Sequence, residues 1–312
     1  MEFFKTTPRF RFMAMRKWCY LISAVLIIGS CVSIAVKGLN FGIDFTGGVV
    51  LEVSNPSGID EQQVRDALDA AGFDAQVQAI GGPARELMIR VLPESGEQDT
   101  NKVGNAIVEA LRSIDPTIEL RRADVVGPQV GAELAEQGGL AMLFTLIMIL
   151  IYVSFRFQWK MAAGTVLAAI HDPIVILGVF SLFQLPFDLS VLAAILAVIG
   201  YSINDTVVVF DRVREVFHTK RKASTAEMLD AALNQTLSRT LMTSFSTLFV
   251  VGSLYVFGGE TLKGFSLAII IGVVVGTYSS IFISAALALD LKLTAADLMP
   301  QQKEDSEIDA LP

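Results

Sequence analysis

The sequence predicts an α-helical polytopic membrane protein with six transmembrane helices and one α+β, ferredoxin-like domain between the first two helices. Hydrophobic residues make up 53% of the 312 residues, and the mean hydropathy is +0.56. Only 18% of the residues are charged, against about 25% in a typical soluble domain. Six apolar segments are long enough to cross about 30 Å of hydrocarbon, and a polar stretch of domain size separates the first from the second.

The predicted spans are Trp18–Val36, Gly139–Phe155, Met161–Phe183, Leu189–Phe210, Leu241–Phe257 and Phe265–Leu289. Arg16 and Lys17 precede the first span as they would precede the apolar run of a signal peptide. The run is too long for a signal peptide, and no small-x-small cleavage site follows, so we expect a retained signal anchor. The predicted parts are an N-terminal segment (1–17), the first span (18–36), an external domain (37–138), five further spans (139–290) and an acidic tail (291–312), which we expect to be disordered.

Basic residues in the short loops indicate the orientation of the spans, because Lys and Arg concentrate on the cytoplasmic side. The segments on one side of the membrane carry Lys5, Arg9, Arg11, Arg16, Lys17, Arg156, Lys160, Arg212, Arg214, Lys220, Arg221, Lys222 and Arg239. The short loops on the other side carry only Lys263. We therefore expect both termini in the cytoplasm and residues 37–138 on the opposite side.

The external domain shows alternating strand and helix patterns. Its predicted elements are the strand Val49–Val53, the helix Asp60–Ala71, the hairpin strands Gln76–Ile80 and Glu86–Val91 around "GGPA", the helix Thr100–Ile114 and the strand Ile118–Val126. Asp60 and Gln63 have the spacing of a capping box, and Gly72 marks a helix end. Val103, Ile107, Val108 and Leu111 have helical spacing on one face. The resulting β-α-β-β-α-β order is that of ferredoxin-like domains.

Four ionisable residues lie at or near membrane depth. They are His171 and Asp172 in the third span, Asp205 in the fourth and Arg239 at the start of the fifth. A carboxylate in hydrocarbon costs about 2.5–3.5 kcal/mol on insertion scales, and such residues usually mark ion or proton pathways. Asp205 lies six residues before Asp211, so it is about 9 Å from the cytoplasmic boundary. The four groups can form a ladder into the membrane. A static Asp205–Arg239 pair and a packing role for His171 are the structural alternatives.

Uncharged polar residues surround these groups. Ser202 lies one turn from Asp205, and Asn204 precedes it. The fifth span carries a stripe of hydroxyl groups at helical spacing, namely Thr240, Thr243, Ser244 and Thr247. These side chains indicate polar contacts between helices rather than exposure to lipid.

The sixth span repeats small residues every fourth position. The repeat consists of Ala268, Gly272, Gly276, Ser280, Ser284 and Ala288. This spacing lets another helix approach closely. The neighbouring helix can belong to this chain or to a partner subunit.

Motifs of soluble enzymes are missing from the sequence. There is no HExxH motif, no Gly-x-Ser-x-Gly elbow and no P-loop, and neither membrane aspartate has the Gly-x-Gly-Asp setting of an intramembrane protease. Cys19 and Cys31 lie about 18 Å apart on one helix, so they form neither a disulfide nor a metal site. A net charge of −8 excludes a basic nucleic-acid footprint. We expect no enzyme, no metal and no cofactor other than protons as a coupling ion.

Five motifs carry a resemblance to a known family. They are "FGIDFTGG" (Phe41–Gly48), "VGPQVGAEL" (Val126–Leu134), "YSINDTVVVFDRVRE" (Tyr201–Glu215), "SRTLMTSFST" (Ser238–Thr247) and "GTYSSIFI" (Gly276–Ile283). In this order and topology the chain resembles the SecF family from Trp18 to Leu289. The resemblance implies membership of the resistance-nodulation-division superfamily and a location in the bacterial inner membrane, with the external domain in the periplasm.

The resemblance also implies partners and a mechanism. SecF associates with its larger relative SecD in a lipid bilayer. The complex resembles a machine, driven by the proton motive force, that helps the SecYEG channel and the ATPase SecA complete the export of unfolded preproteins. Asp205 and Arg239 match the proton-pathway aspartate and arginine of the family, and proton passage would be coupled to movement of the periplasmic domains.

Two other functions are compatible with the residues alone. One is a structural scaffold subunit of the translocase, in which Asp205 and Arg239 form a static pair. The other is half of a proton-coupled small-molecule transporter of the same superfamily, although one small external domain argues against it.

Overall fold

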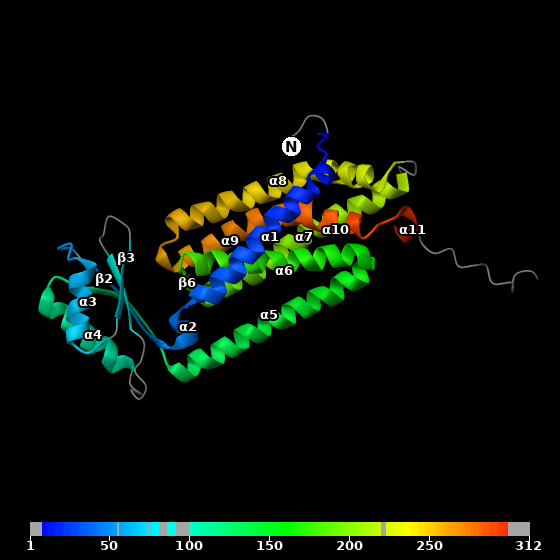
Figure 1. Ribbon diagram of the computed structural model, residues 1–312. Helices are drawn as coiled ribbons and strands as arrows, with labels where there is room; N and C mark the ends of the chain where they lie inside the picture. The colour runs from blue at the N-terminus through cyan, green and yellow to red at the C-terminus, as the bar shows by residue number, and fades with distance from the viewer. Residues whose placement is uncertain are drawn as a thin grey trace, which may run out of the picture.

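A bundle of long helices carries a small α+β domain at one end (Figure 1). The computed structural model describes residues 8–54, 56–73, 75–80, 86–91, 100–219 and 223–298. Within them, six helical segments are long and apolar enough to cross a membrane. They are α1 (Phe12–Lys37), α5 (Pro128–Arg156), α6 (Trp159–Leu182), α7 (Leu189–Thr219), α8 (Thr225–Phe257) and a last segment made of α9 (Glu260–Tyr278), the π-helical η1 (Ser279–Ser284) and α10 (Ala285–Asp290). The short helix α11 (Ala295–Leu298) follows.

All six predicted spans fall on these helices, but most of the helices are longer than the apolar segments. Helix α5 begins at Pro128, and α8 begins at Thr225, well before the predicted span. Hydropathy detects only the part of a helix that suits hydrocarbon, whereas the helix continues to its cap. Ser224 and Glu227 form a capping box that starts α8, and Pro128 occupies the first turn of α5, where its missing N–H costs nothing.

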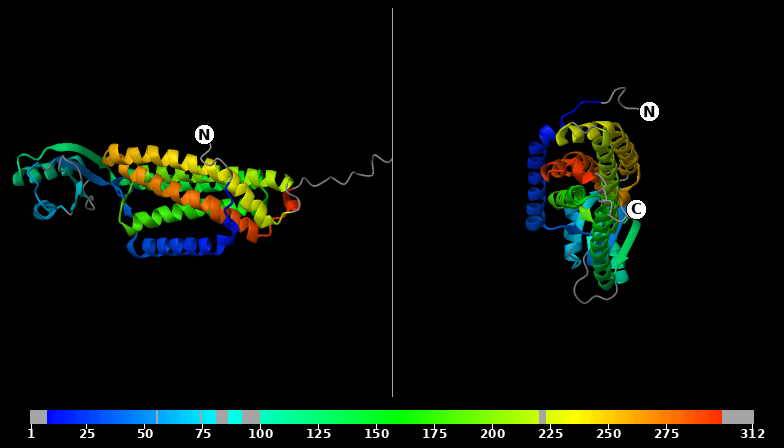
Figure 2. Two further views of the ribbon diagram at one scale, coloured as in Figure 1. Left: turned by 90° about the horizontal axis from the view of Figure 1, so that it is seen from above. Right: turned by 90° about the vertical axis from the view of Figure 1, so that its right-hand side faces the viewer.

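Three of the helices are central and three are peripheral. At least half of the residues in the apolar windows of α6, α7 and α9 are buried, against less than a quarter in α1, α5 and α8. Figure 2 shows α1 running along the outside of the bundle. Phe245 and Phe249 on α8 and Phe144 on α5 are among the large exposed apolar side chains. The outer helices therefore present apolar surface to lipid or to another subunit.

Small residues bring the helix backbones together. A Cβ atom on Gly178 of α6 would lie 2.6 Å from Ser30 Cα of α1. On α9, a Cβ atom on Gly272 would lie 2.6 Å from Val198 Cγ1 of α7. Ser280 and Ser284, further along the predicted stripe of small residues, are fully buried. The stripe thus packs against α6 and α7 of its own chain.

The α+β domain has the predicted β-α-β-β-α-β order. It contains β2 (Gly48–Ser54), α3 (Glu61–Ala70), β3 (Ala75–Ile80), β4 (Glu86–Val91), α4 (Thr100–Ile114) and β5 (Leu120–Val126). The strands lie in the order β3-β4-β2-β5, and every neighbouring pair is antiparallel. Leu51 and Ile89 of the sheet form one core with Leu68 of α3 and with Ile107 and Leu111 of α4.

Details at the ends of the domain's elements differ from the prediction. Helix α3 does begin after Asp60, but the Asp60 side chain makes no capping hydrogen bond, so the predicted capping box is wrong. Gly72 does end the helix: it has φ +88°, and Phe73 N donates to Leu68 O at 2.9 Å, as in a Schellman motif. Strand β5 begins at Leu120 rather than Ile118. The predicted "GGPA" turn and the end of the acidic tail lie outside the described residues.

Three short elements at the junction of the domain and the bundle were not predicted. Strands β1 (Asn40–Phe41) and β6 (Pro186–Phe187) pair in parallel, and helix α2 (Ile43–Thr46) follows β1. They join the end of α1 to the loop between α6 and α7. Elements this short leave no periodic signal in the sequence.

The contact between α1 and α6 can be tested at Gly178. We expect Gly178→Ala to destabilise the protein by about 1–3 kcal/mol, because the added methyl group overpacks against Ser30. Thermal unfolding of the purified protein in detergent measures the effect. Gly252→Ala on α8 is the matched control, because a Cβ atom there meets nothing within 4 Å. Equal unfolding temperatures for the two variants would contradict the observed helix contact.

Candidate functional site

Asp205 lies where three helical elements meet, and among the described residues only hydroxyl groups donate hydrogen bonds to its carboxylate. It is 7% exposed on α7. Thr240 Oγ1 of α8 donates a hydrogen bond to Asp205 Oδ1 at 2.9 Å. Ser280 Oγ of η1 donates to Asp205 Oδ2 at 3.0 Å. Each carboxylate oxygen therefore has one neutral donor, and the three elements meet at this side chain.

Asp172 is the centre of a second buried cluster. It is fully buried on α6. His171 Nδ1 lies 2.9 Å from Asp172 Oδ1, while Ser202 Oγ of α7 and Ser279 Oγ of η1 donate to Oδ2 at 2.6 and 2.9 Å. The tautomer of His171 decides which of these two atoms is the donor of their hydrogen bond. Among the described residues His171 Nε2 has no partner.

The π-helical turn η1 connects the two clusters. Its first residues, Ser279 and Ser280, are consecutive, yet one binds Asp172 and the other binds Asp205. Single π turns inside long helices often occur at functional sites. Gly276, one turn earlier, makes room: a Cβ atom there would lie 3.4 Å from Asp172 Oδ2 and 3.3 Å from Ser202 Cβ. Both carboxylates are thus held by one segment of the last span.

Arg239 does not pair with Asp205. It is exposed on α8, and the ion pairs among the described residues do not join it to any carboxylate. Successive residues of a helix point about 100° apart, so Arg239 faces outward because Thr240 faces Asp205. The static Asp205–Arg239 pair considered from the sequence is therefore absent from this conformation.

The predicted stripe of hydroxyl groups on α8 divides into two parts. Thr240 and Ser244 are buried, and Ser244 Oγ lies 2.6 Å from Thr277 Oγ1 of α9 and 3.1 Å from the hydroxyl group of Tyr201. Thr243 is exposed and Thr247 is half-buried. These two hydroxyl groups donate to carbonyl groups of α8 itself. Among the described residues, Thr240 and Ser244 make the predicted polar contacts between helices, whereas Thr243 and Thr247 bond to their own helix.

Some of the participating residues escaped the sequence analysis. Ser279, Thr277 and Tyr201 contribute hydrogen bonds, although only their presence in an apolar span could have marked them. Asn204, which was predicted as polar support for Asp205, is exposed, because it lies about 100° from Asp205 around α7. The outer surface of α7 and α8 therefore carries exposed polar groups.

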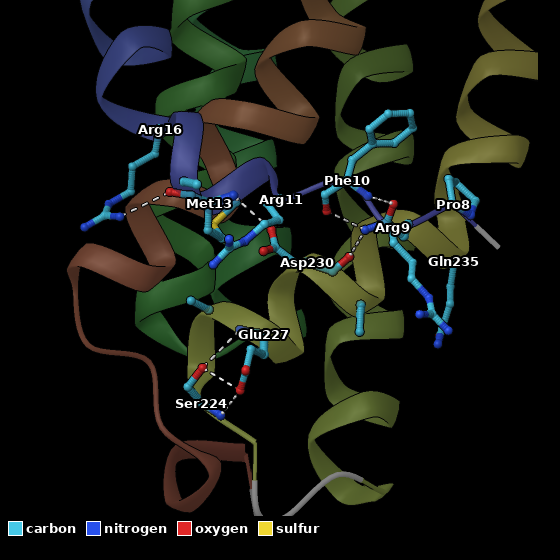
Figure 3. A pocket seen from close by; sticks show the side chains of 14 residues that line it. Pro8, Arg9, Phe10, Arg11, Met13, Arg16, Ser224, Glu227, Asp230 and Gln235 are labelled. Atoms are coloured by element: carbon cyan, nitrogen blue, oxygen red, sulfur yellow. Dashed lines mark hydrogen bonds between the residues drawn. The ribbon is translucent and has the colours of Figure 1, made fainter.

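A separate hollow lies at the end of the bundle away from the α+β domain. Its volume is about 840 Å³, and the N-terminal arm from Pro8 to Arg16 lines it together with the first turns of α8 (Figure 3). Asn234 of α8 exchanges two hydrogen bonds with the backbone of Phe10, at 2.9 and 2.8 Å. Asp230 accepts one from Met13 N at 2.9 Å. The hollow contains neither Asp172 nor Asp205; its contacts fasten the arm to α8.

Two family models match the chain. One, described as "Protein export membrane protein SecD/SecF, C-terminal", matches residues 106–294, which include both buried clusters. The other, described as "SecD/SecF GG Motif", matches residues 32–54, where the chain leaves α1 and enters the α+β domain.

Relatives of similar length carry one description, "Protein translocase subunit SecF". The relative from Vibrio alginolyticus is 47% identical over 100% of this chain and 99% of its own length. Those from Pseudomonas aeruginosa and Escherichia coli O157:H7 are 46% and 42% identical, over 95% and 96% of this chain and 95% and 93% of their own lengths.

Solved structures of SecDF resemble the fold. The crystal structure of SecDF from Thermus thermophilus, described as a translocon-associated membrane protein, is 34% identical with a TM-score of 0.83, and a SecDF in a super-membrane-facing form is 35% identical with a TM-score of 0.69. Each match covers 93% of this chain but only 39% of the SecDF chain. Since the family models and the full-length relatives agree, the chain belongs to the SecF family of protein translocase subunits, a family of multi-pass membrane proteins in protein transport.

Proposed function

We propose that the chain couples the proton motive force to late steps of protein export through the Sec channel, with Asp205 as the proton carrier. The observation that supports this role is that neutral hydroxyl groups, rather than an arginine, donate the hydrogen bonds to the Asp205 carboxylate. An arginine partner would hold the carboxylate in its ionised form, whereas hydroxyl groups can donate to the ionised form and accept from the protonated one. Thr240 and Ser280 thus suit both states of Asp205.

Ser280 has a second acceptor within reach. Its Oγ lies 3.0 Å from Asp205 Oδ2 and 3.1 Å from Thr277 O of its own helix. When Asp205 takes up a proton, the Ser280 hydroxyl can turn to Thr277 and accept the new O–H. The exchange needs no movement of the backbone, and it changes the bonding between α7 and η1.

The membrane potential supplies enough free energy for such a cycle. Each elementary charge that crosses the membrane contributes about 2.3 kcal/mol per 100 mV. A bias of about 5.5 kcal/mol moves a two-state equilibrium from 1:99 to 99:1. A few protons per cycle therefore suffice to drive a conformational change. The two SecDF structures, with equal coverage and different TM-scores, indicate that related chains adopt more than one arrangement.

His171 and Asp172 have a supporting role in this proposal. Asp172 is less exposed than Asp205 and is hydrogen-bonded to the His171 ring, which cannot turn away as a hydroxyl group can. Its hydrogen bonds from Ser202 and Ser279 fix α6 to α7 and η1. The scaffold function considered from the sequence thus applies to the Asp172 cluster rather than to an Asp205–Arg239 pair.

The family and the exposed residues of the helix bundle indicate which partners and which membrane would surround the chain. SecD would cover the polar side of α7 and α8, where Asn204, Arg239 and Thr243 are exposed, and lipid would cover the apolar remainder. The complex would lie in the bacterial inner membrane with both termini cytoplasmic. SecYEG, SecA and unfolded preproteins would be its working partners. The chain would act without enzymatic activity and without a cofactor besides protons.

The α+β domain would be periplasmic and ferredoxin-like. Its element order and antiparallel sheet order β3-β4-β2-β5 support that class. Among its described residues no group of three or more His, Cys, Asp or Glu could hold a metal ion. A mechanical or binding role for the emerging polypeptide fits such a domain.

The central prediction concerns Asp205→Asn. The amide keeps the shape and an acceptor oxygen but cannot take up a proton, so we expect normal assembly with SecD and loss of gradient-dependent export. Preprotein translocation into inner-membrane vesicles, with and without a proton gradient, measures the effect.

Glu215→Gln is the matched control, because Glu215 is an exposed carboxylate on the same helix. We expect its export to equal that of the wild type. Full gradient-dependent export in Asp205→Asn vesicles would show that the aspartate is structural, and the scaffold function would replace the proposed one.

Asp172→Asn should differ from Asp205→Asn in both stability and export. We expect it to lower the thermal stability of the complex by about 1–3 kcal/mol, because a buried hydrogen-bonded group is changed, while most gradient-dependent export is retained. Unfolding in detergent and the same vesicle assay separate the two effects. Loss of gradient-dependent export without loss of stability would place Asp172 in the proton pathway.

A further inference from the structure

Residues 40–48, hereafter the joint, lie where the α+β domain meets the helix bundle. They comprise β1, α2 and the two glycines that follow. Figure 1 shows α2 between the sheet and the ends of the long helices. The joint falls within the segment that the GG-motif family model matches. Its contacts lead to three different parts of the molecule.

The first contact is with the start of α7, the helix that carries Asp205. Leu189 N, the first N–H group of α7, donates to Asp44 Oδ2 at 2.9 Å. Asp188 accepts from Val191 N at 2.8 Å. Carboxylates are favourable at this end of a helix, where N–H groups lack partners. Thus α7 is capped by its own residue and by one from the joint, about 24 Å from Asp205 along the helix.

Backbone and ring contacts strengthen this attachment. Gly42 N donates to Phe187 O at 2.7 Å, next to the β1–β6 pairing. The rings of Phe45 and Phe187 stack with centroids 5.6 Å apart. A shift of the α7 end would therefore displace the joint with it.

The second contact is with the start of α5. Gly47 has φ +70°, and a Cβ atom there would lie 2.7 Å from Pro128 Cα. A Cβ atom on Gly131 would lie 2.7 Å from Gly47 N. Only glycine permits this approach of two backbones. Strand β2 begins at Gly48 and pairs with β5 at Val126. The segment that enters the domain from the joint and the segment that leaves it for α5 therefore lie side by side, and neither is a flexible linker.

The third contact is with strand β4. Arg90 Nη1 donates to Asn40 Oδ1 at 3.2 Å, and Nη2 donates to Thr46 Oγ1 at 3.3 Å and to Phe41 O. The guanidinium group thus binds both β1 and α2. It attaches the joint to a strand that does not itself connect to the bundle.

We propose that the joint passes movement of α7 to the α+β domain, with Asp44 and Arg90 as positioning residues. This inference rests on the proposed function, because it needs a cycle at Asp205 that moves α7. Coupling between two sites is reciprocal. A polypeptide held by the domain would therefore also bias the state of α7 through the same contacts.

Two measurements on the full chain assembled with SecD test the proposal. Spin labels on Ser113 of α4 and on Phe183 at the end of α6, in a background with Cys19→Ala and Cys31→Ala, report the distance between the domain and the bundle. Vesicle export with and without a proton gradient reports coupling. The variants are Asp44→Ala and Arg90→Ala, with Asp69→Ala and Arg112→Ala as matched controls, because both control residues are exposed in the same domain.

We expect both joint variants to broaden the distance distribution and to lower gradient-dependent export at least about fivefold, the lower end of usual coupling. Gradient-independent export and both controls should be unchanged. Asp44→Asn, which keeps an acceptor oxygen for Leu189 N, should restore most of the coupling. If Asp44→Ala fails to assemble, Thr46→Val replaces it, because it removes an acceptor of Arg90.

An unchanged distance distribution in the joint variants would overturn the attachment. A broadened distribution with full gradient-dependent export would overturn the coupling role, provided that Asp205→Asn abolishes that export. If Asp205→Asn also exports normally, the proposed function fails together with the coupling role, while the distance measurement still decides the attachment.

Discussion

The arrangement of the bundle depends on one constraint: inside hydrocarbon, every polar group must find its partners within the protein. The carboxylates of Asp172 and Asp205 meet it with hydrogen bonds from α6, α7, α8 and η1. The partners other than His171 are hydroxyl groups on short side chains, so they reach only if the helices stay in place. A change in the charge of one carboxylate therefore alters the hydrogen bonds of the elements that bind it.

Close packing is what brings the short side chains within reach. Gly276 leaves room beside Asp172, and Gly164 of α6 lies against the backbone of Ser284. The π turn then points two consecutive serines at two different helices. Small residues in the last span thus serve the polar network as well as the packing, and a larger residue at these positions would separate the donors from the carboxylates.

The sequence predicted the elements better than their ends and faces. Hydropathy found six spans but not the start of α8, because the capping box at Ser224 lies in a polar segment. The sequence left a static pair of Arg239 with Asp205 open as one alternative, yet the face of α8 that meets Asp205 belongs to Thr240, and only the packing of the two helices decides this. Asp44 belongs to the "FGIDFTGG" motif, but its role could not be predicted, because its partner Leu189 lies 145 residues away.

The outward position of Arg239 fits the proposed role of Asp205 as a proton carrier. A cation beside Asp205 would favour its ionised form, so a proton carrier needs the cation at a distance while the proton is bound and near while it is released. Arg239 adjoins Thr240, which binds Asp205 directly. A rotation of α8 by about 100° about its axis would exchange the two, since that is the angle between successive residues of a helix. The same rotation would break the Thr240 hydrogen bond, so on the proposed function the movement of α8 and the charge state of Asp205 are linked through one pair of neighbouring residues.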